Sequence, residues 1–424
     1  MLEHMKLQNV GPSPEMEMRL SPRLNIITGD NGLGKSFLLD VAWWSLTRTW
    51  AGHPALPING EDPSIEYRVV GKTKTAISVT STFRRSDATW PVEAKRPPMP
   101  GIVVYVRIDG GFSVWDPARN YWRNDPGRPP AYHFRAPEVW DGLVVGAERP
   151  CEGLERDWVN WQEGKKPQFE VLERVLKILS PVDEPIRPGP PRRLLIGEGR
   201  DRPTLRIGND IVPIALASAG IRRVLALAYL LVWAWHEHRV SAELLNKPVE
   251  NRVVVLFDEP ETHLHPRWQR TLLPSLLEAL DALRKGAEPE PQVITATHAP
   301  LVVASLEPYF DANKDDLFLL QAEAGNIRLK GDQFAKQGDA TNWLVSEAFG
   351  LEQAYSIEAE RAIEAAEAWM REEYDILPKG LKTKNAIHKE LQRVLPGHDP
   401  FWPRWIVTSD MYKLPKPSKK GKKK

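Results

Sequence analysis

The sequence contains almost no cysteine and no excess of charge of either sign. Its 424 residues include a single cysteine, Cys151, which excludes an internal disulfide framework and a zinc cluster built on cysteine. Lys and Arg number 57 and Asp and Glu 56, for a net charge of +1. The whole chain therefore has no electrostatic bias toward nucleic acid or an anionic membrane. Such sparse cysteine fits a reducing compartment, and we expect a cytoplasmic protein.

The sequence also lacks a hydrophobic run long enough to cross a bilayer. The longest run, Val224 to Trp235, has about half the length that a membrane span needs and is closed by His236. The N-terminal residues show no apolar segment behind basic residues, as a secretory signal would require. We therefore expect no membrane partner, and we interpret the run as a buried core helix.

Short apolar strands that alternate with helices predict an α/β fold with a mostly parallel sheet. Strands of this kind are typical of a sheet that helices cover on both faces. The expected strands are Leu24 to Thr28, Val253 to Phe257 and Val293 to Thr297. The helices expected between and after them are Ser36 to Trp50, Ile221 to His238 and Trp268 to Lys285.

The remaining segments give a weaker pattern. We expect a β-rich N-terminal lobe, in which the proline-rich residues 51–203 form short strands, long loops and one helix. After Pro308 two edge strands and three helices are predicted, and the lysine-rich residues 413–424 are expected to be disordered. The individual segments are strands at 7–10, 16–20, 204–212, 317–320 and 327–329, and helices at 168–179, 341–349, 357–373 and 383–395.

A glycine-rich loop follows the first buried strand and opens a helix. It reads Gly29-Asp30-Asn31-Gly32-Leu33-Gly34-Lys35-Ser36, the pattern of a P-loop. Glycines let successive backbone N–H groups turn toward phosphate oxygens, and the helix start adds unpaired donors. We expect Lys35 to reach the β- and γ-phosphates of ATP and Ser36 to bind Mg²⁺.

Two adjacent carboxylates end a second buried strand. Asp258 and Glu259 follow the apolar run Val253 to Phe257. Since an unpaired buried charge is costly, carboxylates at this place indicate a chemical role. We expect Asp258 to hold Mg²⁺ and Glu259 to polarise the attacking water.

Three segments in this part of the chain resemble ABC-type P-loop ATPases related to the overcoming-lysogenization-defect proteins. Asp258–Pro266 is similar to their Walker B region, Ala296–Pro300 to their switch-histidine segment, and Ala217–Arg223 occupies the place of their signature. The resemblance implies that Ser218 and Gly220 contact the γ-phosphate of ATP bound by an opposite subunit. It implies that His298 senses that phosphate. Because the ATP would lie between two copies of the chain, the resemblance also implies a homodimer or a higher homo-oligomer. A capped core histidine is the alternative for His298.

The sequence departs from this family's pattern at several places. Ala219 replaces the usual middle glycine or serine of the signature, and Ile221 stands where Gln or Glu is common. Gln162 and Gln168 are the candidates for the glutamine that normally follows the P-loop lobe. His263 and His265 could bind a metal ion or could position the dimer seam. The second interpretation is favoured because the sequence shows no third metal ligand near them.

The resemblance divides the chain into an ATPase head and an extension. The expected head is 1–310, with 51–203 inserted between P-loop and signature, and 311–412 is a mainly helical extension. The insert is too short and too rich in proline for a long coiled coil. After His298 no carboxylates are arranged as a nuclease would need.

An ATPase without its own effector resembles the stand-alone ATPase subunits of bacterial anti-phage defence systems such as Septu and PARIS. The resemblance implies a separately encoded nuclease or toxin as partner. The aromatic segment Leu395–Trp405 is the candidate docking surface, and packing of these aromatic side chains onto the protein's own core is the alternative. The alternative function is a repair or recombination ATPase that clamps DNA, with DNA as the partner.

Overall fold

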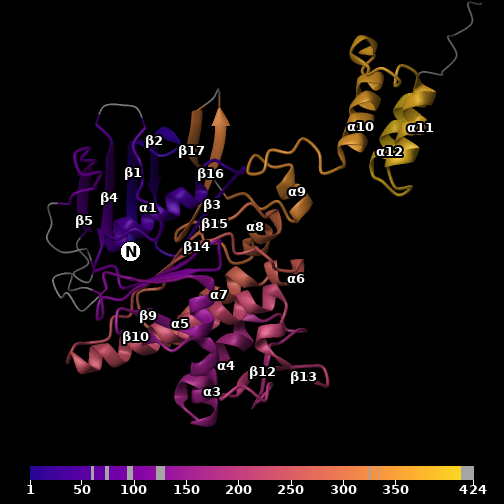
Figure 1. Ribbon diagram of the computed structural model, residues 1–424. Coiled ribbons are helices and arrows are strands. Elements are labelled where there is room, and N and C mark those ends of the chain that lie inside the picture. The colour runs from indigo at the N-terminus through magenta and orange to yellow at the C-terminus, as the bar shows by residue number, and fades with distance from the viewer. Residues whose placement is uncertain are drawn as a thin grey trace, which may run out of the picture. The chain divides into compact units, whose positions relative to one another are not determined.

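The computed structural model describes residues 1–58, 62–71, 76–92, 99–120, 129–323, 326–332 and 334–411 (Figure 1). It divides into two compact units, Met1–Phe349 and Gly350–Lys424, which are treated separately. The expected disordered tail, 413–424, lies outside the described residues.

An eight-stranded sheet forms the centre of the first unit. Five neighbouring strands, β16, β3, β15, β14 and β6, run parallel, and β17, β7 and β8 add antiparallel edges. The mostly parallel sheet predicted from the sequence is confirmed. In spatial order the strands are β17 (Asn326–Asp332), β16 (Asp315–Glu323), β3 (Leu24–Gly29), β15 (Gln292–Ala296), β14 (Val253–Asp258), β6 (Ile102–Val106), β7 (Phe112–Trp115) and β8 (Tyr132–Phe134).

A second, antiparallel sheet covers one face of the central sheet, with helix α1 (Lys35–Thr47) packed between them (Figure 1). Val103 and Tyr105 of β6 point into this core, together with the fully buried Trp43 of α1. Alternate residues of the same strand, Val104 and Val106, face the opposite core. The second sheet has the order β2 (Ser13–Arg19), β1 (Leu2–Val10), β4 (Ser64–Val70) and β5 (Ala76–Thr82).

Helices cover the other face of the central sheet. The longest is α5 (Ala219–Leu244), and the apolar run Val224 to Trp235 lies within it, almost wholly buried, as predicted. Among the described helices none is long and apolar enough to cross a membrane. The helices that share this core with α5 are α2 (Ala136–Asp141), α3 (Leu154–Glu163), α4 (Pro167–Leu179), α6 (Pro266–Gln269), α7 (Leu272–Arg284), α8 (Pro300–Leu306) and α9 (Ala340–Leu344).

Residues 51–203 do not form a lobe of their own. Strands β4 and β5 complete the second sheet, and β6 lies beside β14 in the central sheet. The expectation of one helix was wrong, because α2 and α3 accompany α4. The predicted strand 204–212 is a hairpin of β12 (Arg202–Ile207) and β13 (Asp210–Pro213), since Gly208 turns the chain with a φ of 60°. Strand β11 (Arg187–Arg192) pairs with β12, and β9 (Leu143–Val145) pairs with β10 (Glu148–Cys151).

The C-terminal boundary also differs from the expected one at 310. Strand β16 is internal, because it pairs with β3 on one side and with β17 on the other, and this pairing keeps both strands in the first unit. Helix α9 (Ala340–Leu344) precedes the division after Phe349.

The second unit is helical and has its own core. It contains α10 (Ile357–Met370), η2 (Tyr374–Ile376), α11 (Lys384–Val394) and α12 (Phe401–Met411). Phe401 and Trp405 are buried in this core, and the Trp405 indole donates a hydrogen bond to His388. The docking interpretation of 395–405 is therefore wrong for these two aromatic side chains, which pack within their own unit.

Candidate functional site

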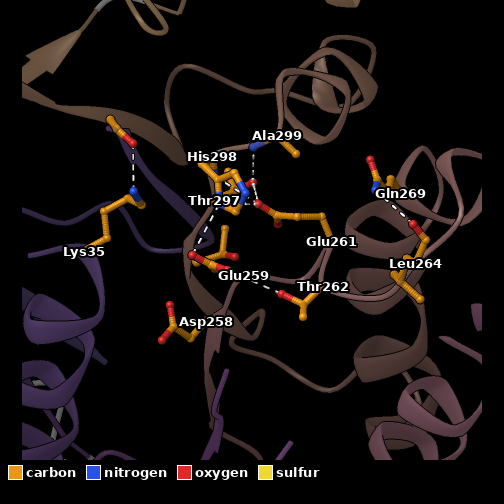
Figure 2. A network of polar contacts seen from close by, with 12 residues as sticks. Lys35, Asp258, Glu259, Glu261, Thr262, Leu264, Gln269, Thr297, His298 and Ala299 are labelled. Carbon is orange, nitrogen blue, oxygen red and sulfur yellow. Dashed lines mark hydrogen bonds and ion pairs between the residues drawn. The ribbon is translucent and has the colours of Figure 1, made fainter. Parts of the chain in front are cut away.

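The P-loop lies between β3 and α1, in the strand–loop–helix context that the sequence predicted. Gly32 and Gly34 have φ values of 79° and 98°, which a residue with a Cβ rarely adopts. The Lys35 ammonium donates to the carbonyl oxygens of Gly29 (2.7 Å) and Asp30 (2.9 Å), so the side chain folds back over the loop (Figure 2). Lys35 is thus held at the place where phosphate oxygens would meet the backbone donors of the loop.

Burial lowers the pKa of the Lys35 ammonium, and the nearby carboxylates oppose this shift. The largest of these opposing effects comes from Glu259, followed by Glu261 and Asp258. These three carboxylates, at the end of β14 and just after it, therefore lie near enough to Lys35 to act on its charge.

Asp258 ends β14 beside Ser36. It is 2% exposed, and the Ser36 hydroxyl donates a hydrogen bond to its carboxylate. Burial raises the pKa of Asp258 to about 6, and the charges of Glu259 and Asp40 add to the shift. Its Oδ1 atom is buried and has no hydrogen-bond partner among the described residues. A carboxylate oxygen with a free lone pair next to a hydroxyl fits the oxygen ligands that Mg²⁺ prefers.

Glu259, Glu261 and His298 form a compact polar network (Figure 2). The imidazole Nδ1 of His298 lies 3.3 Å from Glu259 Oε1 and 3.3 Å from Glu261 Oε1. Glu261 is 6% exposed, and its Oε1 accepts hydrogen bonds from the Thr297 hydroxyl (2.8 Å) and the His298 backbone N–H (2.9 Å). The structure thus brings together the two residues predicted as catalytic, and Glu261, whose role the sequence did not reveal, ties their segments to each other.

The signature segment is arranged around the start of α5. Ser218 caps the helix, because its hydroxyl oxygen accepts from the Ile221 N–H at 3.3 Å. A Cβ on Gly220 would lie 2.8 Å from the His263 carbonyl oxygen, so this close approach requires glycine. Ser218 and Gly220 line a hollow of about 1300 Å³ together with His263 and His265. No P-loop residue is among the residues that line it.

Arg223 connects the signature helix to the Walker B strand. The Nη2 atom of its guanidinium donates hydrogen bonds to the backbone carbonyl oxygens of Asp258 and Glu259, both at 3.1 Å. No role for Arg223 was expected from the sequence. The sequence offers one indication of a role: Arg223 is a charged residue on the inward side of an otherwise apolar helix, and a buried charge needs a partner.

The P-loop mouth is completed by the end of β6 rather than by either glutamine candidate. Tyr105, Arg107 and Asp109 line a pocket of about 650 Å³ with Ser36 and Asp258. The glutamine candidates are engaged away from the loop, with Gln162 bonded to Trp158 and Gly189 and Gln168 bonded to His236. The sequence indicated a short strand at 102–107 within the β-rich lobe, but it did not place that strand beside β14 in the central sheet.

Asp40 of α1 faces the same pocket. The Tyr105 hydroxyl is hydrogen-bonded to its carboxylate, and burial raises the pKa of Asp40. His265, one of the histidines considered as a metal ligand, instead caps α6, because its Nδ1 accepts from the Arg267 N–H at 3.3 Å. Neither His263 nor His265 belongs to a group of ligand atoms, among the described residues, that is close enough to share a metal ion.

Comparison with known families agrees with this geometry. Residues 202–304, about a quarter of the chain, match the family model described as "AAA domain, putative AbiEii toxin, Type IV TA system". The matched range contains the signature segment, Asp258, Glu259 and His298. Residues 202–304 are thus similar to an ATPase domain of this family, and the P-loop at 29–36 lies outside the matched range. At the level of this family, the match supports ATPase activity.

One curated relative is the "Retron Vc95 probable ATPase" of Vibrio cholerae serotype O1 biovar El Tor. It is 36% identical over 62 residues, which are 15% of this chain and 10% of that protein. The chain thus matches about a tenth of that relative's length.

Similar solved structures include the SMC head domain from Thermotoga maritima and the recombination mediator protein RecF. The first is 14% identical with a TM-score of 0.39, covering 78% of this chain and 99% of that chain. The second is 11% identical with a TM-score of 0.38, covering 78% and 98%. Likeness at this level says nothing about activity or partners.

Proposed function

We propose that the chain binds ATP with Mg²⁺ and hydrolyses it between two copies of itself. The observation that carries the proposal is the separation of the site into two parts. The P-loop, Asp258, Glu259 and His298 gather at one place, whereas Ser218 and Gly220 line a hollow to which no P-loop residue contributes. A signature serine turned away from its own P-loop is suited to nucleotide held by another copy.

Each residue of the first part has a role that its surroundings favour. Lys35 and the loop N–H groups bind the phosphates, and Ser36 with Asp258 would hold Mg²⁺, which neutralises charge on the phosphate oxygens when bound. Glu259, fixed against His298, accepts a proton from the attacking water. His298 is 45% exposed, which leaves its ring accessible to a γ-phosphate while Nδ1 faces the carboxylates.

We further propose that this ATPase regulates a separately encoded effector, a nuclease or toxin, in an anti-phage defence system. The proposal is supported by the description of the matching family, which names a toxin of a toxin–antitoxin system, and by the retron ATPase relative. Both matches cover a small share of the chain and neither description names a partner, so the effector rests on this proposal alone.

Native mass spectrometry of the tagged chain tests both proposals. The chain is expressed with its own neighbouring genes and purified with ATP and Mg²⁺. We expect an even-numbered assembly that carries nucleotide and a second protein. A nucleotide-bound dimer without a partner that retains DNA would contradict the defence role and favour the DNA clamp. In that case DNA would stimulate hydrolysis with a steep dependence on salt.

A further inference from the structure

Two arginines lie directly opposite each other in the small sheet that precedes the signature. Arg187 of β11 and Arg206 of β12 are register partners. Side chains at such positions emerge on the same face with Cβ atoms about 5 Å apart, and two like charges there destabilise the pair. Both arginines are exposed, and among the described residues neither has a hydrogen bond or an ion pair from its side chain.

A second arginine pair in the same ladder shows how the chain otherwise neutralises such a contact. Arg192 lies opposite Arg202, and the Arg202 guanidinium forms ion pairs with Glu155 and Glu198. The charge of this second pair is therefore offset by carboxylates of the same chain. The charge of the Arg187 and Arg206 pair is not.

Both unpaired arginines line the hollow of about 1300 Å³ that contains Ser218 and Gly220. The hollow also contains Arg267 and the carboxylates of Asp183 and Glu184, and Arg267 lies 3.7 Å from Asp183 and 2.9 Å from Glu184. Arg267 offsets one of these two negative charges. With Arg187 and Arg206 on the β11–β12 wall, three arginines stand against two carboxylates, which leaves the hollow a net charge of +1.

We propose that Arg187 and Arg206 bind the phosphates of an ATP molecule held by the P-loop of a second copy, beside Ser218. Guanidinium groups bind phosphate oxygens in a bidentate manner, and the anion relieves the repulsion between the two arginines. The inference rests on the proposed function, because it requires ATP to lie between two copies. It adds two positioning residues that no signature motif contains.

The test uses Arg187→Gln with Arg206→Gln in a Glu259→Gln background, which slows hydrolysis and holds ATP. Arg192→Gln is the matched control, because it removes an exposed arginine from the same strand outside the hollow. ATP-induced dimerisation is measured by light scattering, and binding of ATP to one copy by a fluorescent analogue. We expect the double variant to weaken dimerisation at least 10-fold, with binding to one copy changed less than twofold. The control should dimerise normally.

A complementation experiment locates the contact between copies. A Lys35→Ala chain lacks the P-loop cation and an Arg187→Gln, Arg206→Gln chain lacks the pair, so each alone should hydrolyse ATP poorly. Mixed, they form one intact composite site, and hydrolysis should rise above that of either chain. Thermal unfolding of the double variant should occur at the wild-type temperature or above it, since like-charge repulsion is removed.

Three results would overturn the proposal. If the double variant dimerises as well as its parent, the arginines do not bind the nucleotide, and the composite ATP site stands without them. If the Glu259→Gln parent does not dimerise with ATP, the composite site itself fails and the proposal fails with it. If the double variant keeps its ATP-induced dimer but loses anisotropy-detected binding of a duplex DNA oligonucleotide, the pair serves nucleic acid instead.

Discussion

The two parts of the candidate site differ in how their residues are held. On the Walker B side the carboxylates of Asp258 and Glu261 are buried. Glu261 accepts hydrogen bonds from Thr297 and His298, and Arg223 donates to the backbone carbonyl oxygens of Asp258 and Glu259. On the signature side Ser218 is exposed and its hydroxyl makes one hydrogen bond, to the helix it caps.

This difference follows from what each side has to do. Groups that move a proton or hold a cation need fixed positions before the reaction, and burial with hydrogen bonds supplies them. A surface that closes on another molecule keeps its polar groups accessible until contact is made. Under the proposed function, the site joins a rigid half that carries the chemistry to an open half that a second copy would complete. Substitutions on the two halves should then fail in different ways.

The largest effect is expected for Glu259→Gln on the rigid half. Loss of the proton acceptor should lower the rate of ATP hydrolysis by about 100- to 1,000-fold, as is typical for removal of a general base. The charge that opposes the burial of Lys35 is also reduced, but the loop carbonyl contacts remain. Binding of a fluorescent ATP analogue should therefore persist. Hydrolysis near the wild-type rate would remove Glu259 from its proposed role.

Ser218→Arg probes the open half and should have the next largest effect. A long side chain at this exposed position prevents close approach of a second copy, so hydrolysis should fall by about 10- to 100-fold, the cost of misplacing a reacting group. Binding of ATP to one copy should not change. Ser218→Ala is the control, and as a lost helix cap it should cost about 1 kcal/mol of stability. Equal hydrolysis by the arginine variant would show that this half does not close on nucleotide.

Glu261→Gln tests the contact that ties the Walker B segment to the switch segment. The amide keeps an oxygen acceptor but loses the charge that strengthens the bonds from Thr297 and His298, so hydrolysis should fall by about 3- to 10-fold and stability by about 1–2 kcal/mol. Urea denaturation and steady-state kinetics measure the two effects. A double-mutant cycle with Thr297→Val should give a non-zero coupling energy, and strict additivity would contradict the contact.

The last expected effect concerns stability alone, as a dependence on pH that only the rigid half should show. The pKa of Asp258 is raised from 3.8 to about 6, chiefly by burial, so its contribution to stability is present below pH 3.8 and is lost as pH rises through 6. Without nucleotide and with EDTA, Asp258→Asn should match wild type near pH 4 and exceed it by about 2 kcal/mol near pH 7.5.

Urea denaturation at several pH values measures this difference. Ser218→Ala should show no such trend, because it removes no titrating group. A constant difference between Asp258→Asn and wild type across this range would contradict the raised pKa.

The sequence identified the rigid half well and the rest of the site poorly. The P-loop, Asp258, Glu259 and His298 follow or precede apolar strands, so strand position alone placed them at one edge of the sheet. Asp40, Tyr105 and Arg223 are ordinary residues within helices and a strand, and only the three-dimensional arrangement gives them partners. Glu261 escaped notice for the same reason.

Two errors in the fold have physical causes. Ile102–Val106 is a five-residue apolar run among prolines, and nothing local distinguishes a strand beside β14 from an edge strand. The aromatic segment 395–405 was interpreted as a rigid surface because of its prolines. Pro403 instead lies in the first turn of α12, where backbone N–H groups have no acceptor within the helix, so a proline there breaks no hydrogen bond.

The position of β3 in the sheet determines when the P-loop is completed during synthesis. Residues 24–29 leave the ribosome before their two neighbouring strands, β15 and β16, which lie at 292–296 and 315–323. At about 5–20 residues per second, the ribosome needs tens of seconds to add them. Until then β3 has no partner strand on either edge, and its apolar side chains have no sheet to join. The P-loop therefore comes before the switch-histidine strand in the chain, but the nascent chain can assemble it only after that strand has been made.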